Sequence, residues 1–368
     1  MMFGTIELFF QRNTCVIIVT VKNTYFCVAV VTTIASFLGI FTIAADFNLE
    51  EGNISANASV TLSTNDSSVQ SETNSSLPLD SKKDSLIKPN DPFFDKQWAL
   101  SNLNLSDLWN MTAGNSDVVV AILDTGIDAT HEDLRDRVIA EVNFTNSPSE
   151  NDINGHGTHV AGIICAAANN GVGVTGLVPD CKILNVKVAD DYGFCVEPAV
   201  ARGIVWSVDN GANIINISLE IRNPSASLEQ AVNYAWQHGV LIIAAAGNQG
   251  NQSAVYPARY DNCIAVAAVR PDNTLAPLSN YGDWVDMAAP GFNIYSTLPG
   301  NNYGYETGTS FAAAYVSAFA AMLSRTICDA NGDGKSNDEI RSVIEKSCSQ
   351  VNYAGYTLRI INPTACIQ

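Results

Sequence analysis

The chain has 368 residues, a length that fits one large domain with appendages or two ordinary domains. Hydrophobic residues make up 47% of it, which permits a sizeable core. Acidic residues number 37 against 19 basic ones, and the formal net charge of −18 repels phosphate backbones and anionic lipid, so no nucleic-acid partner is expected.

Apolar residues dominate positions 25–45, after the basic Arg12 and Lys22. This pattern, with small residues at Thr42 and Ala44, predicts a secretory signal peptide within residues 1–45. A run of about 20 apolar residues also suffices to span a bilayer as an uncleaved signal anchor. Both alternatives export the rest of the chain. Cleavage would give a secreted or lumenal protein, and an uncleaved anchor would hold the protein to a membrane through this segment alone.

Residues 46–90 are rich in Ser, Asn and Thr and nearly free of aromatics. Such a segment buries too little apolar surface to offset the entropy of ordering, so we predict a disordered linker. It carries four glycosylation sequons, at Asn53, Asn57, Asn65 and Asn74. The composition changes at Asp91, where we expect a globular unit to begin and to run over residues 91–368.

Export would place the chain in an oxidising compartment, where cysteines form disulfides. The cysteines beyond the targeting segment are odd in number, so at least one stays unpaired or pairs between chains. They are Cys165, Cys181, Cys195, Cys263, Cys328, Cys348 and Cys366. Sequence alone does not determine how they pair.

Short apolar runs alternate with stretches of helical spacing after the linker. The runs predict strands buried on both faces, at residues 118–124, 183–188, 214–219, 240–246 and 263–269. Helical spacing marks residues 156–168, 198–210 and 227–238, and an Ala-rich helix is expected from about Thr309. This alternation predicts an α/β fold, a doubly wound and mainly parallel sheet with helices on both faces and chemistry at the carboxyl ends of its strands.

Three polar residues occupy positions where such a fold carries chemistry. Asp124 ends the first buried strand, and His156 opens a helix between two glycines. Ser310 lies in the first turn of the Ala-rich helix, where free N–H groups favour negative charge. A serine hydroxyl needs a base to remove its proton, and the base works best when a buried carboxylate fixes its tautomer. The order Asp, His, Ser differs from that of α/β-hydrolases, whose G-x-S-x-G elbow is missing at Ser310.

Seven motifs surround these residues: DTGID at 124–128, GHGTHVAG at 155–162, NISL at 216–219, AAAGN at 244–248, YPA at 256–258, AAPG at 288–291 and TGTSFAA at 307–313. With these motifs the chain resembles the subtilisin family of serine endopeptidases over residues 91–368. The stretch NDPFF, with which the globular unit begins, is similar to the thermitase-like branch of that family. The resemblance implies that Asp124 orients the base His156 and that Ser310 is the nucleophile. It also implies that Asn248 donates to the oxyanion beside the Ser310 N–H.

The remaining histidines have plainer interpretations. His159 follows His156 by one turn and is interpreted as a packed helix residue, because a metal site would need a third ligand and HEXXH is absent. His131 is expected in a surface turn and His238 at a helix end.

Substrate contacts are expected from Ser218, Leu219, Glu220 and Val255. The resemblance places the first three along the specificity pocket, where substrate pairs as an added strand. Relatives usually have the sequence SLGG here, so Glu220 and Ile221 take the places of two glycines. Their side chains are expected to narrow the pocket entrance or to change its charge. Glu220 either favours a basic residue before the scissile bond or points to solvent, which we favour. The resemblance places Val255 at the floor of this pocket. Its size suggests that substrates carry a medium-sized apolar residue at the cut.

Structural calcium is a further implication of the resemblance. Asp91, Asp133 and Asn170 match ligands of a tight site in thermitase-like relatives. The loop carbonyls of Ala168, Val172 and Val174 would complete the shell. In the alternative interpretation Asp133 caps a turn and Asn170 favours a bend.

A weaker second calcium candidate is an EF-hand-like loop with Asp329, Asn331 and Asp333 at positions one, three and five. Its twelfth position is Ile340 instead of Glu. Runs of Asp, Asn and Gly also form plain turns, so both interpretations stay open.

Together these patterns predict a secreted or membrane-tethered serine endopeptidase that hydrolyses polypeptides through an acyl-enzyme. The contrary hypothesis is a non-catalytic, subtilase-like surface protein that keeps the scaffold for binding. The altered pocket favours that hypothesis, and the intact Asp124, His156, Ser310 and Asn248 oppose it. Residues 46–90 lack the apolar content of a folding pro-domain, so the catalytic unit folds without one or uses a separate pro-domain or inhibitor.

Overall fold

The computed structural model describes residues 5–11, 14–21, 24–30, 41–50, 53–62, 88–101, 103, 105, 108–109 and 118–366. The chain forms two compact units, Met1–Lys83 and Asp84–Gln368. The first contains a three-stranded antiparallel sheet and a separate antiparallel hairpin. Its strands are β1 (Thr5–Gln11), β2 (Thr14–Val21), β3 (Thr24–Val30), β4 (Phe41–Glu50) and β5 (Asn53–Leu62).

The predicted targeting segment (1–45) and linker (46–90) fall partly on these strands and partly outside the described residues. Both therefore stay predictions. None of the helices in the described ranges is long and apolar enough to cross a membrane.

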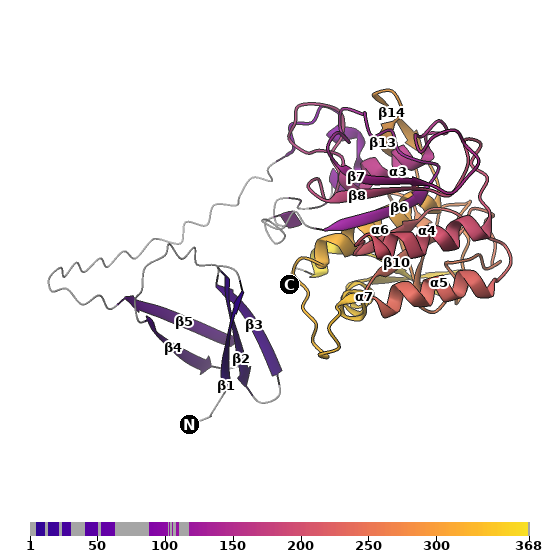
Figure 1. Cartoon of the computed structure of the whole chain (residues 1–368). Coiled ribbons are helices and arrows are strands. Elements are labelled where there is room, and N and C mark those ends of the chain that lie inside the picture. The colour runs from indigo at the N-terminus through magenta and orange to yellow at the C-terminus, as the bar shows by residue number, and fades with distance from the viewer. Residues whose placement is uncertain are drawn as a thin grey trace. The chain divides into compact units, whose positions relative to one another are not determined.

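The second unit is built on a nine-stranded sheet with the order β15-β16-β12-β11-β10-β9-β6-β8-β7 (Figure 1). All neighbouring strands run parallel except β15 and β16 at one edge. The strands are β6 (Val119–Asp124), β7 (Val138–Asn143), β8 (Lys182–Lys187), β9 (Ile214–Ile217), β10 (Leu241–Ala245), β11 (Cys263–Val269), β12 (Met287–Pro290), β15 (Ser349–Tyr353) and β16 (Tyr356–Ile360). A separate hairpin joins β13 (Ile294–Leu298) to β14 (Asn302–Glu306).

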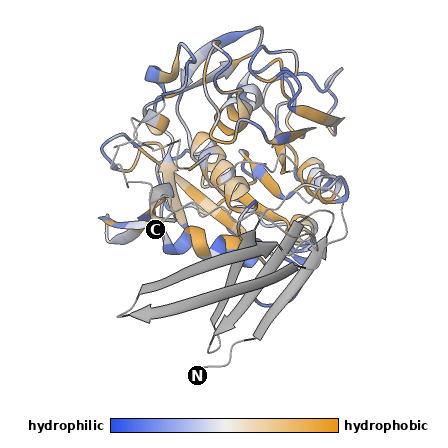
Figure 2. Cartoon of the chain, turned by 90° about the vertical axis from the view of Figure 1, so that its left-hand side faces the viewer, coloured by the Kyte–Doolittle hydropathy of each residue, from blue (hydrophilic) through white to orange (hydrophobic). Residues whose placement is uncertain are grey.

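Alternate residues of the central strands pack into two different core clusters, one on each face of the sheet. Along β6, Val120 and Ile122 belong to one cluster, and Ala121 and Leu123 belong to the other. Apolar side chains on both faces of the strand are therefore buried, as the sequence predicts for parallel strands covered on both sides. In Figure 2 the hydrophobic colour lies on these interior elements and the hydrophilic colour on the surrounding loops.

Helices cover both faces of this sheet, which confirms the predicted doubly wound fold. The cluster of the first face includes residues of α3 (His156–Cys165), α6 (Thr309–Leu323) and α7 (Asn337–Lys346). The cluster of the second face includes residues of α4 (Glu197–Asp209) and α5 (Ala226–Gln237). Short turns of helix complete the unit, namely η1 (Phe94–Lys96), α1 (Trp98–Ser101) and η2 (Pro363–Cys366).

Helix α6 is buried along its whole length. Its run of alanines is compatible with this position because small side chains let a helix pack closely against the strands beneath it. The expected start near Thr309 is confirmed, and it places Ser310 in the first helical turn.

The expected disulfides do not involve every cysteine. Cys165, Cys181, Cys195 and Cys263 are free thiols. Pairing among the cysteines nearer the C-terminus stays a prediction.

Candidate active site

The candidate site lies at the carboxyl ends of three adjacent strands, β9, β6 and β10. Asp124 is the last residue of β6, Ser218 follows β9, and Asn248 comes three residues after β10. Helices α3 and α6 bring His156 and Ser310 to the same edge, each within the first two helical residues. The fold thus gathers residues that are far apart in the sequence, as expected for the functional edge of a parallel sheet.

Asp124 and His156 form a tight pair. The distance between Asp124 Oδ1 and His156 Nδ1 is 2.7 Å, and the carboxylate is fully buried. The same oxygen accepts the backbone N–H of Thr125 at 2.7 Å. The close approach of α3 requires glycine after the histidine, because a Cβ on Gly157 would lie 2.0 Å from the carbonyl oxygen of Gly126.

Opposing effects act on the pKa of the His156 imidazole. Burial of the ring disfavours its charged form, and this is the largest single effect. The Asp124 carboxylate, by its charge and its hydrogen bond, and the more distant charges of Asp152 and Glu306 together outweigh burial. The pKa of His156 is therefore raised above its ordinary value, which makes the ring a stronger base.

Ser310 is buried, and its hydroxyl donates to the carbonyl of Ser218 at 3.2 Å. The Ser218 hydroxyl in turn donates to the Ser310 carbonyl at 3.0 Å. Among the described residues, no hydrogen bond joins this hydroxyl to His156. Such loose geometry is common in a site without substrate.

The side chain of Asn248 is held by its oxygen. Asn248 Oδ1 accepts from the backbone N–H of Thr309 at 2.9 Å and from its hydroxyl at 3.1 Å. This leaves the amide Nδ2 as a donor beside Ser310, at the start of α6. Asn248, Ser310 and His156 line one cleft of about 270 Å³.

The cleft also contains most of the expected substrate contacts. Ser218, Leu219 and Glu220 line it, and the Glu220 carboxylate accepts from Gln249 Nε2 at 2.7 Å. Val255 is buried in the core and is not among the residues that line the cleft.

Two buried charged residues that the sequence analysis did not single out support this site. Asp152 accepts four hydrogen bonds of 2.7–2.9 Å, from the Thr125 hydroxyl, the Gly155 N–H and the N–H and hydroxyl of Thr158. It thereby joins the turn after Asp124 to the first turn of α3. An Asp shortly before a helix is a capping signal, which would have identified it.

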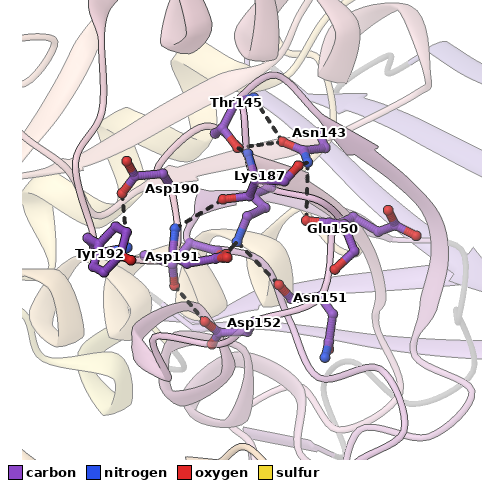
Figure 3. Close-up of polar contacts among 12 residues, drawn as sticks. Asn143, Thr145, Glu150, Asn151, Asp152, Lys187, Asp190, Asp191 and Tyr192 are labelled. Atoms are coloured by element: carbon purple, nitrogen blue, oxygen red, sulfur yellow. Dashed lines mark hydrogen bonds and ion pairs between the residues drawn. The ribbon is translucent and has the colours of Figure 1, made fainter.

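Lys187 is fully buried at the end of β8, next to Asp124 in the sheet register. Its ammonium donates to the carbonyls of Thr125 and Asn151. It also pairs with Asp191 at 2.8 Å, and Figure 3 shows Lys187 between the segments that carry Asn151 and Asp191. One cation thus holds three loops at the edge where Asp124 lies. No local pattern marks this role, because a lysine in an apolar strand gives no indication of where its ammonium lies.

The other histidines lie outside the cleft lining. His159 is buried beside Phe311, and burial lowers its pKa to about 3, so it is a neutral packed residue as expected. His238 follows the end of α5, also as expected. The surface turn expected for His131 is wrong, because the ring is fully buried and its Nε2 lies 3.2 Å from the Asn302 carbonyl.

Three side chains of the first calcium candidate lie together. Asp133 Oδ1 accepts from Asn170 Nδ2 at 2.8 Å, and Asp91 accepts from the Asn170 N–H at 3.1 Å and the Thr175 hydroxyl at 2.5 Å. Asp133 is fully buried, and burial outweighs its hydrogen bonds and raises its pKa. A bound cation would relieve this cost of a buried carboxylate.

The adjoining loop supplies oxygen atoms of the kind that calcium binds. Within the described residues no hydrogen bond ends on the carbonyl oxygens of Ala168, Val172 or Val174. Within the described residues, no group of three or more His, Cys, Asp or Glu side chains is placed to hold a metal ion. Carbonyl and amide oxygens would thus have to complete a shell around the two carboxylates, a donor set that suits calcium.

The second calcium candidate forms an exposed turn. Asp329 accepts from the N–H groups of Gly332 and Gly334 at 2.7 Å, and Asn331 accepts from the N–H of Asp333 at 2.9 Å. These bonds within one loop are those of ordinary Asp and Asn turns.

Comparison with known proteins agrees with this geometry. A model of the subtilase family matches residues 115–359. The thermophilic serine proteinase of Bacillus sp. (strain AK1) is 41% identical over 269 residues, which make up 73% of this chain and 65% of that protein. Thermitase of Thermoactinomyces vulgaris is 39% identical over 73% of this chain and 94% of its own length. A solved protease from Pseudoalteromonas arctica aligns with a TM-score of 0.68 and 29% identity, over 76% of this chain and 98% of that one.

The matched region contains all seven motifs and the whole cleft lining. The aligned segment is 65% of the first relative's length but nearly all of thermitase. Because the family model covers well over half of the sequence, the chain belongs to the subtilase family of serine proteases.

Proposed function

We propose that the chain is an exported serine endopeptidase in which Asp124, His156 and Ser310 hydrolyse peptide bonds through an acyl-enzyme. The observation that carries this proposal is the buried Asp124 carboxylate 2.7 Å from His156 in a cleft that Ser310 shares. A non-catalytic binding protein would have no need for a buried charge that orients a histidine. The substrates are polypeptides.

The chemistry follows from the positions of the groups. His156 Nε2 takes the proton of the Ser310 hydroxyl as its oxygen attacks the peptide carbonyl, and the Asp124 carboxylate stabilises the resulting imidazolium. The Asn248 amide and the Ser310 N–H donate to the oxyanion, because the first N–H groups of α6 have no acceptor within the helix. His156 then protonates the leaving amine, and water attacks the acyl-enzyme by the same route.

A fluorophosphonate probe tests whether Ser310 is activated. We expect the full chain to be labelled at Ser310, because only a serine with an adjacent base reacts at a useful rate. The variant His156→Ala should lose labelling, whereas His159→Gln, at the packed histidine one turn later, should keep it. The position of the label is read by peptide mass spectrometry. A wild-type chain that is folded but unlabelled would favour the binding-protein hypothesis.

Export and domain organisation rest on sequence alone. The proposal includes a signal peptide or anchor in residues 1–45, a glycosylated linker over 46–90 and the catalytic domain over 91–368. Because the linker lacks the apolar content of a folding pro-domain, the catalytic domain in this proposal folds alone or with a separate pro-domain.

We further propose that Asp91, Asp133 and Asn170, with the carbonyls of Ala168, Val172 and Val174, hold a structural calcium ion. When bound, the ion would neutralise two carboxylates and join the entry segment at Asp91 to the domain. The exposed loop of Asp329, Asn331 and Asp333 remains a second, weaker candidate.

Calcium removal provides the test. Chelation is expected to lower Tm by about 5–10 °C, because an ion at 100 times its Kd contributes about 2.7 kcal/mol to stability. The variant Asp133→Asn should unfold at a lower temperature and show little further response to chelation. Asp329→Asn, in the weaker candidate loop, should keep most of the response. Equal responses to chelation in wild type and Asp133→Asn, measured by calorimetry, would refute this assignment.

A further inference from the structure

The cleft beside Ser310 lies between two chain segments. One segment is residues 218–220, after β9, and the Ser310 hydroxyl donates to its first carbonyl at 3.2 Å. The other is residues 245–249, at the end of β10, and it carries Asn248. A side chain of a substrate whose carbonyl is held at Ser310 and Asn248 would therefore enter between these two walls.

The Glu220 side chain reaches from the first wall to the second. Its Oε1 accepts from Gln249 Nε2 at 2.7 Å, and its Oε2 lies 2.8 Å from the position that a Cβ on Gly247 would take. The carboxylate is thus in the cleft between the walls. Glu220 is half-buried and its hydrogen bond to Gln249 is exposed to solvent, so the carboxylate lines the cleft while still reaching water.

The charge of this carboxylate is uncompensated. Glu220 is the one Asp or Glu among the described residues that line the cleft, and no Lys or Arg lines it. The ion pairs found within the described ranges do not include Glu220. Gln249 donates a neutral hydrogen bond to one oxygen, which leaves the negative charge in place. The net charge of −18 adds a field that attracts cations.

We propose that Glu220 selects polypeptides with Arg or Lys immediately before the scissile bond, an inference that rests on the proposed function. A guanidinium or ammonium group between the walls would form charge-assisted hydrogen bonds with the Glu220 carboxylate. An apolar side chain would instead remove water from this carboxylate without supplying a partner, which costs binding free energy. The apolar preference suggested from Val255 has no support in the cleft, because Val255 lies in the core.

The test compares two peptide substrates that differ only by Arg or citrulline before the cleaved bond, so that shape is kept and charge is removed. We expect kcat/KM of the full-length wild type to favour Arg by about tenfold or more, the size of one partly desolvated charge pair. Glu220→Gln keeps the size of the side chain and its polarity but not its charge, and it should bring the ratio close to one. Glu229→Gln, an exposed site on α5, removes the same charge elsewhere and should keep the wild-type ratio.

Three outcomes would overturn the inference: equal kcat/KM for Arg and citrulline in the wild type, an unchanged ratio in Glu220→Gln, or a basic preference confined to another position of a peptide library. Each leaves the proposed endopeptidase activity standing, because the wild type still cleaves peptide. A chain that neither cleaves any peptide nor reacts with the fluorophosphonate probe would refute the proposed function as well.

Discussion

Replacing Ser310 with alanine is expected to abolish peptide hydrolysis while the fold is kept. The corresponding loss in subtilisin itself is about 2 × 10⁶ in kcat, and the remaining rate comes from substrate binding and the oxyanion donors. The loss of folding stability should be small, because the hydroxyl donates one hydrogen bond, to the Ser218 carbonyl, and alanine has a high helix propensity. The measurement is kcat on a cleaved peptide, followed by mass spectrometry, together with Tm by calorimetry.

Ser317→Ala is the matched control, since Ser317 is a second buried serine of α6. Its hydroxyl donates to Asn216 Oδ1 at 2.9 Å and lines no part of the cleft. This variant should lose about 1 kcal/mol of stability and retain kcat within about tenfold. If Ser310→Ala kept more than a hundredth of the wild-type rate, another nucleophile would have to be sought.

Asp124→Asn is expected to lower kcat by about 10⁴, the effect of the same substitution in a serine protease of another fold. The Asp124 oxygen accepts the proton of His156 Nδ1, which keeps Nε2 free to act as the base. An asparagine can present its amide N–H to Nδ1 instead, and the imidazole proton then lies on Nε2. The variant would hold the ring in the same place with the wrong nitrogen protonated.

The pH dependence of this variant gives an independent check. His156 acts as a base only when neutral, so kcat/KM rises with pH through its pKa. Asp124 helps to raise that pKa, and removing its charge should move the rise to lower pH even as the plateau falls. Asp128→Asn changes a buried carboxylate of the same motif that bonds to Thr130 and Gly300, and it should leave the midpoint in place. A midpoint that moves upward in Asp124→Asn would contradict the pairing.

The chain's apolar patterning was sufficient to predict the central sheet but not its edges. Strands β6, β8, β9, β10 and β11 are apolar on both faces, and their existence follows from composition within short segments. Strand β7 has exposed residues such as Ile139, at 53%, and β12 (MAAP) has no β-branched residue and ends in proline, so neither has the sequence pattern of a buried strand. Both are stabilised by pairing with a neighbour that is distant in the sequence.

The sequence by itself determined which groups are available and where the chemistry lies. Asp124, His156 and Ser310 each stand at an element boundary that local pattern reveals, and the parallel fold then brings such boundaries to one edge. Only the tertiary structure decided where the other polar side chains point. The burial of His131, the three loops held by Lys187 and the contact of Glu220 with Gln249 all depend on partners far along the chain. Local pattern carries no information about such contacts, because the direction of a long polar side chain is set by the donors and charges that folding brings to it.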